Sequence, residues 1–159
     1  MTKESLNSAT NPDLTPEQEV AKTRMIELLS AGKTDLALQI KEGAKLSEQV
    51  IQSSEVQNVI KDIIRYFLSS GYTWLATEII EGFSVSPEAI RDSVKSAVIE
   101  AASHGSVEEI MKIKEEFEVP EEVFKSQEAQ EAAKKGANKL IERRYGSDAQ
   151  KLKEVFGIT

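Results

Sequence analysis

Several residue types that carry chemistry or crosslink small folds are missing from this chain of 159 residues. It contains no cysteine, which excludes disulfides, thiolate zinc sites and a thiol nucleophile. His104 is its one histidine, so a catalytic triad or a metal site with several imidazoles has no second partner. No Gly-rich phosphate loop of either standard spacing occurs. These absences predict a protein that is not an enzyme and uses no cofactor or metal.

Long apolar runs are missing as well. No window approaches the roughly 18 apolar residues of a membrane helix, and the first residues lack the apolar core of a signal peptide. We therefore expect a soluble, cytoplasmic protein with no membrane partner. Residues 1–14 are rich in Ser, Thr and Asn without apolar periodicity, so we expect a disordered leader before a single domain over residues 15–159.

Aromatic residues, glycine and proline are scarce, whereas helix formers are abundant. Aromatic residues make up 6% of the chain, and it has 8 Gly and 4 Pro against 40% apolar and 30% charged residues. This balance favours helices over strands, so the expected fold class is all-α. The first helix should begin at Thr15, with Pro16 at its first position and Gln18 completing a capping box.

One short phrase occurs four times along the chain. It reads IKEGAKLS, IIEGFSVS, IKEEFEVP and LKEVFGIT, at residues 40–47, 79–86, 113–120 and 152–159. The copies recur at a period of 34–39 residues, which is typical of a stacked repeat protein. We therefore predict an α-solenoid of about three and a half stacked helical hairpins, with each phrase closing one hairpin.

Glycines and capping residues place the turns inside these units. Gly32, Gly71 and Gly105 each precede a short second helix, and an apolar residue follows each glycine at the same distance. Capping boxes are expected at Ser106 with Glu109 and at Ser147 with Gln150, each directly after a glycine that ends a helix, Gly105 or Gly146.

The first helices of two units also correspond. Residues 46–57 match residues 119–130 at several positions, and a break is expected near Ser53 and near Ser126. The unit between them is shorter by four residues, which is about one helical turn. Losing a whole turn keeps the apolar stripe on the same side of the helix.

The segment EAASHGSVEEIMKIKEEFEV, residues 100–119, resembles the second half of an ankyrin repeat, and residues 32–46 are similar to it. In that family a helix of small residues ends at Gly and a second helix leads into the next turn. The Thr-Pro-Leu-His opening of ankyrin repeats is missing from every unit, so the repeats resemble the family only in part. The resemblance implies binding to other macromolecules.

Stacked hairpins leave an extended concave face for a protein or peptide partner. We expect that face to use polar positions of the second helices together with Trp74; the residues are Lys33, Gln39, Tyr72, Trp74, Glu78 and Lys112. For Trp74, the sole tryptophan, burial between units is the favoured interpretation, and an exposed anchor for a partner is the alternative. Tyr66 and the phenylalanines are expected in the core.

An alternative function rests on the basic C-terminal third of the chain. Lys135, Lys139 and Arg143 are spaced by four residues and share one helix face, which is the best nucleic-acid signal in the sequence. Acidic residues interrupt the face, so a solvated face of mixed charge is favoured over an RNA-binding helical repeat.

Three further features have simple structural interpretations. His104 is expected to lie exposed at a helix C-terminus, and the acidic run at residues 115–122 is expected to form a solvated turn rather than a cation site. The apolar residues at the end of the chain predict a homodimer through that end; they are Leu152, Val155, Phe156 and Ile158.

Overall fold

The computed structural model describes residues 13–159, and within that range the chain forms ten α-helices and no strand. The all-α prediction is confirmed. The helices are α2 (Pro16–Ser30), α3 (Thr34–Gly43), α4 (Glu48–Ile51), α5 (Ser54–Ser69), α6 (Thr73–Gly82), α7 (Pro87–Ser103), α8 (Val107–Glu116), α9 (Glu121–Lys125), α10 (Gln127–Glu142) and α11 (Gly146–Phe156). The expected leader at 1–14 lies almost entirely outside the described residues.

Helix α2 begins as the sequence predicts. The Thr15 side chain accepts a hydrogen bond from the Gln18 backbone N–H, and the Gln18 side chain accepts one from the Thr15 N–H, both at 3.1 Å. Pro16 occupies the first turn, where its missing N–H leaves no helical bond unmade. The capping box is therefore confirmed.

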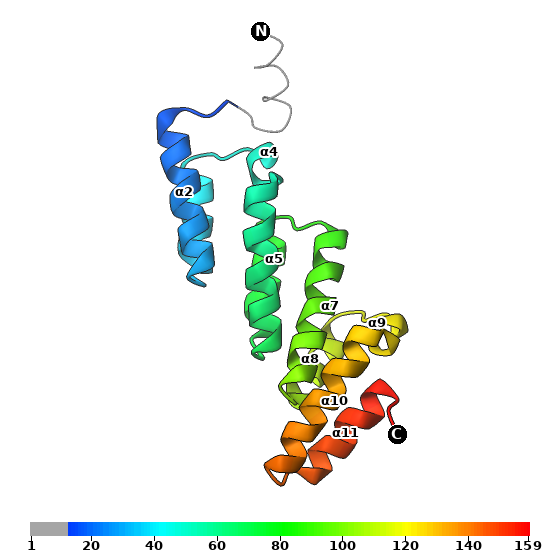
Figure 1. Ribbon diagram of the computed structural model, residues 1–159. Helices are drawn as coiled ribbons and strands as arrows, with labels where there is room; N and C mark the ends of the chain where they lie inside the picture. Colours follow the sequence, from blue (N-terminus) through cyan, green and yellow to red (C-terminus); the bar gives the residue numbers. More distant parts are fainter. Residues whose placement is uncertain (1–12) are drawn as a thin grey trace.

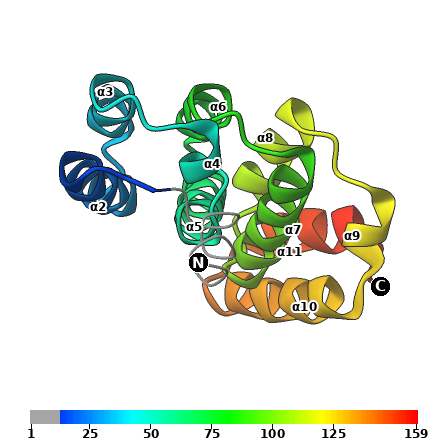
Figure 2. The ribbon, with the colours of Figure 1, turned by 90° about the horizontal axis from the view of Figure 1, so that it is seen from above.

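The long helices lie side by side in the order of the chain. Helix α5 packs between α2 and α7, and α10 packs on the other side of α7 (Figure 1). We call α2, α5, α7 and α10 the first-helix layer. The shorter helices α3, α6, α8 and α11 contact one another in the same order and form the second-helix layer (Figure 2). Each short helix also packs against the long helix that precedes it.

Tight left-handed turns join each long helix to its short partner. Gly32, Gly71 and Gly105 have φ of 75°, 86° and 74°, a region that glycine enters without a steric penalty. In the fourth turn the residue with positive φ is Arg144, at 66°, and Gly146 is instead the first residue of α11. The expected helix end at Gly146 is therefore wrong by two residues.

Both capping boxes expected after glycines are also wrong. Ser106 is the N-cap of α8, but its ψ of 72° differs from the extended conformation of a capping serine, and its side chain makes no cap hydrogen bond. Ser147 lies inside α11, and the Gln150 side chain bonds to Glu154 instead. Each second helix begins two residues after a residue with left-handed backbone conformation, which turns the chain into the helix. The second helices therefore start without a side-chain cap.

The predicted breaks near Ser53 and Ser126 are confirmed. The Ser53 hydroxyl donates to the Val50 carbonyl at 2.7 Å, and the Ser126 hydroxyl donates to the Val123 carbonyl at 2.9 Å. These bonds close the short helices α4 and α9 before α5 and α10 begin. The shorter unit has no such break, and α7 runs unbroken over 17 residues.

The core lies between the two layers. Aliphatic residues dominate it, with Phe83 and Phe156 at the ends of α6 and α11, Phe67 in α5 and Phe124 in α9. Leu152 and Phe156 are buried within the chain, so neither is available on the surface for the expected C-terminal dimer, and Val155 and Ile158 are half-buried. Among residues 13–159, no helix is both long enough and apolar enough to cross a bilayer.

Candidate functional site

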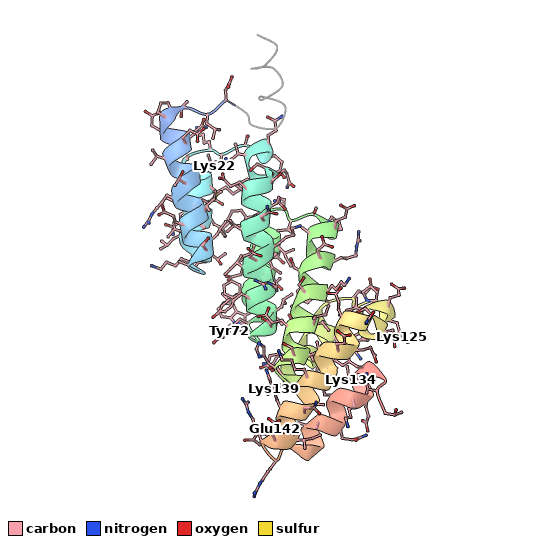
Figure 3. All side chains as sticks on the ribbon, in the orientation of Figure 1. Lys22, Tyr72, Lys125, Lys134, Lys139 and Glu142 are labelled. Atoms are coloured by element: carbon pink, nitrogen blue, oxygen red, sulfur yellow. The ribbon has the colours of Figure 1, made fainter. Side chains whose placement is uncertain are left out.

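A pocket of about 640 Å³ opens where the turn between α2 and α3 meets the C-terminal half of α5. Its floor and walls are largely apolar, from α5 and the start of α6: Val59, Ile63, Tyr66, Phe67, Tyr72 and Leu75. Asp62 and the turn residues 30–32 complete its rim. Tyr72 lies at the lower end of the α5–α6 pair (Figure 3). This end of the molecule therefore combines an apolar hollow with exposed aromatic rings.

A second hollow of about 310 Å³ lies between the N-terminal ends of α3 and α6. It is lined by Lys33, Thr34, Asp35, Leu36, Trp74 and Glu78, and it shares Gly32 and Leu75 with the first pocket. Because two lining residues are common to both, we treat the hollows as one surface. We call it the Tyr72–Trp74 groove.

Trp74 is exposed, so the expected burial between units is wrong. Its exposed fraction is 60%, and that of Tyr72 is 48%. The inward face of α6 is formed by Thr73, Ala76 and Ile79, which follow a spacing of three residues. Trp74 and Glu78, four residues apart, therefore share the outward face of the same helix.

Tyr66 was also expected in the core, and it is 55% exposed. Its neighbours Ile63, Ile64 and Phe67 carry the buried stripe of α5. Asp62, four residues before Tyr66, is exposed, and this polar position was the sequence signal that the tyrosine faces outward. Sequence reasoning missed Tyr66, Asp62 and Leu36 as groove residues.

Of the six partner-binding positions expected from sequence, the structure gathers four. Lys33, Trp74 and Glu78 line the smaller hollow, and Tyr72 lines the larger one. Gln39 is exposed on α3 but lines neither hollow, and Lys112 is half-buried on α8.

Carboxylates outnumber cations around the groove. Asp35 and Glu78 stand at its α3–α6 end and Asp62 at its α5 end, and Lys33 is the one cation that lines it. Asp62 lies 3.9 Å from Arg65 one turn further along α5. Asp35 and Glu78 form no ion pair within residues 13–159.

Two corresponding threonines differ in their surroundings. Thr73 donates its hydroxyl to the Glu116 carboxylate at 2.8 Å. The buried Thr34 hydroxyl has no hydrogen-bond partner within the described chain. Gly82 occupies the place in segment 79–86 that Glu116 occupies in segment 113–120, so it provides no carboxylate. This difference leaves α3 and α6 without the threonine–glutamate bond that joins α6 to α8, and these two helices are linked instead by Lys41 Nζ, which donates to the Gly82 carbonyl at 2.8 Å.

A comparable hollow of about 740 Å³ lies between α8 and α11. Acidic residues dominate its charged lining, and Met111 is its large exposed apolar residue. Because it contains no aromatic side chain, it offers less rigid apolar area than the Tyr72–Trp74 groove.

The basic positions of α10 are spread along its surface. Lys135 and Arg143 are exposed, and Lys139 is half-buried. Figure 3 shows Lys134, Lys139 and Glu142 on this helix, so a carboxylate lies among the cations. Tyr145 beside Arg143 and Arg144 is 57% exposed.

The remaining candidate residues have structural roles. His104 is exposed at the C-cap of α7, as expected. The acidic residues of the run are exposed, but they span the end of α8 and the start of α9, and only Glu118 lies in the turn between them. Within residues 13–159 no group of three His, Asp or Glu side chains is arranged to hold a metal ion.

Comparisons with known proteins found no matching family model, no matching curated protein and no matching solved structure.

Proposed function

We propose that this protein is an α-solenoid of stacked helical hairpins that works as a non-enzymatic interaction module. Its partner is a protein or a peptide, and the binding surface is the Tyr72–Trp74 groove. The single observation that carries the proposal is the exposure of Tyr66, Tyr72 and Trp74 along the two adjoining hollows of this groove.

The order of helix contacts supports the solenoid. Each long helix packs against the long helices of the neighbouring pairs, and each short helix packs against the neighbouring short helices. In a solenoid each unit contacts its neighbours, which leaves long surfaces open to a partner. The hydrogen bonds at Ser53 and Ser126 give two of the units the same local geometry.

Exposed aromatic side chains support the binding role. Tryptophan and tyrosine supply much of the binding free energy at protein interfaces, because they bury a large rigid area on association. Contiguous exposed apolar patches on a monomer are typical of interaction sites. Three aromatic rings and Leu36 around one groove are such a patch.

A random peptide library displayed on phage tests this function. We expect selection on the full chain to enrich peptides that bind wild-type protein and not the Tyr72→Ala/Trp74→Ala double variant. A matched control replaces Met111 and Ile141, two exposed apolar residues outside the groove, with alanine. If no peptide distinguishes the groove variant from the control variant, the groove is not a peptide-binding site.

The alternative proposal is an RNA-binding helical repeat that uses Lys135, Lys139 and Arg143. Its specific support is the exposed Tyr145, two residues after Arg143, because exposed aromatic rings in basic surfaces stack on unpaired bases. Titration of a labelled single-stranded RNA at low salt tests it. The RNA alternative predicts binding that weakens steeply with salt and is lost when all three residues are replaced by alanine.

A further inference from the structure

We propose that the Tyr72–Trp74 groove selects a peptide segment in which a large apolar side chain is flanked by lysine or arginine on both sides. This inference rests on the proposed peptide-binding function and names the chemistry of the partner. It follows from three properties of the groove: its apolar floor, the carboxylates at both of its ends, and its exposed aromatic rings.

The larger hollow determines the anchor of the ligand. Its walls are Ile63, Phe67 and Leu75, and its volume of about 640 Å³ is large enough for an aromatic or branched aliphatic side chain. Burying one such side chain contributes about 1.5–3 kcal/mol, which corresponds to roughly ten- to a hundredfold in Kd. An apolar anchor is therefore the main source of affinity.

The rim determines the charge of the flanking residues. Asp62 stands at the α5 end of the groove, 3.9 Å from Arg65, and Asp35 and Glu78 stand at the α3–α6 end, where Lys33 is the one cation among the described lining residues. A ligand that crosses the groove therefore meets negative charge on both sides of its anchor. Electrostatic complementarity then favours lysine or arginine at the flanks and disfavours glutamate or aspartate.

The aromatic rings favour the same ligand. Tyr66, Tyr72 and Trp74 are all about half exposed, so part of each ring is open to a ligand cation. A lysine or arginine over an exposed aromatic face tightens binding by roughly two- to fivefold in Kd, and tryptophan is the strongest acceptor. The aromatic rings and the carboxylates therefore both favour a ligand with lysine or arginine beside its apolar anchor.

Trp74 is the sole tryptophan of the chain, so its fluorescence reports directly on occupancy of the groove. The probes are synthetic peptides of equal length without tryptophan: one with phenylalanine between lysines, one with phenylalanine between glutamates, and one with serine between lysines. We expect the lysine–phenylalanine peptide to bind about tenfold or more tightly than either of the others, and its affinity to fall as salt screens the rim charges.

A charge reversal separates the groove from the general acidity of the protein. In the Asp35→Lys/Glu78→Lys variant, affinity for the lysine–phenylalanine peptide should fall about tenfold, and the glutamate–phenylalanine peptide should become the tighter ligand. The matched control is Glu42→Lys/Glu81→Lys, which changes the net charge equally on the same two helices at exposed positions outside the groove. This control should bind like wild type.

Each other outcome overturns the inference, and the outcomes distinguish it from the proposed function. Tighter binding of the glutamate–phenylalanine peptide at the same groove would be consistent with a peptide-binding function but would reject the preference for lysine or arginine flanks. Equal losses in both double variants would show attraction to overall charge, without a groove. A change in Trp74 fluorescence with protein concentration alone, or on removal of residues 1–12, would identify a second copy or the chain's own first residues as the occupant.

Discussion

Gly136 of α10 lies directly against the carbonyl oxygen of Ala102 in α7, so that a Cβ at position 136 would overlap that oxygen. The same Cβ would also lie 2.9 Å from the backbone nitrogen of Gly105. Both contacts are with backbone, which cannot rotate away as a side chain can. The close approach of the two helices therefore depends on the missing side chain of Gly136.

Gly136→Ala should destabilise the protein by roughly 1–3 kcal/mol, because α7 and α10 must move apart to admit the methyl group. Urea unfolding followed by circular dichroism measures this change. Gly43→Ala is the matched control, since a Cβ there meets nothing within 4 Å, and it should be neutral or stabilising by up to about 1 kcal/mol. Equal behaviour of the two variants would contradict the close packing of α7 and α10.

Arg144→Gly should raise the free energy of unfolding by up to about 1 kcal/mol, because Arg144 has a φ of 66° that glycine adopts more easily. Arg144→Ala is its control, since it removes the same charge and keeps a Cβ. Chemical denaturation of the two variants measures the difference in their free energies of unfolding. If Arg144→Gly were less stable than Arg144→Ala, the result would contradict a left-handed backbone conformation at position 144.

Thr34→Val and Thr73→Val should differ in their effects on stability. The valine at position 73 removes the bond to Glu116 and should cost about 1 kcal/mol, whereas at position 34 it removes a buried hydroxyl that has no hydrogen-bond partner among residues 13–159 and should be neutral or stabilising. Thermal unfolding of both variants is the measurement. A cost at position 34 as large as that at position 73 would show that the Thr34 hydroxyl has a partner.

Trp74→Ala should change the free energy of unfolding by no more than about 0.5 kcal/mol, as is usual for exposed positions. Phe83→Ala, at the fully buried aromatic residue that caps the C-terminus of the same helix, should cost about 3–5 kcal/mol. Acrylamide should quench Trp74 fluorescence in the native protein almost as efficiently as in urea. Strong protection of the native fluorescence would mean that the indole is buried.

The regular part of the architecture could be predicted from the sequence because it depends on local signals. The capping box at Thr15, the left-handed glycines and the breaks at Ser53 and Ser126 each arise from a few neighbouring residues. The fourth turn could not be predicted in this way. Arg144 adopts a conformation that glycine prefers, and the nearby Gly146 was wrongly predicted to end the helix.

The candidate site was predicted in part. The sequence predicts Tyr72, Lys33 and Glu78 as partner-binding polar positions of the second helices, and the structure gathers them at one groove. The burial expected for Trp74 and Tyr66 was wrong, because composition favours burying aromatic residues while the position on the helix decides which way they face. The hollow itself depends on how two helix pairs meet, and no short segment of sequence encodes that distance.

The most direct test of the central claim is to map peptide binding by NMR on the full chain labelled with nitrogen-15. Titration with the lysine–phenylalanine peptide should shift the indole N–H of Trp74 and the backbone amides of Lys33, Tyr66 and Tyr72, and leave those of α10 unchanged. Shifts concentrated at Lys135, Lys139 and Arg143, or no shifts at the groove, would contradict the account.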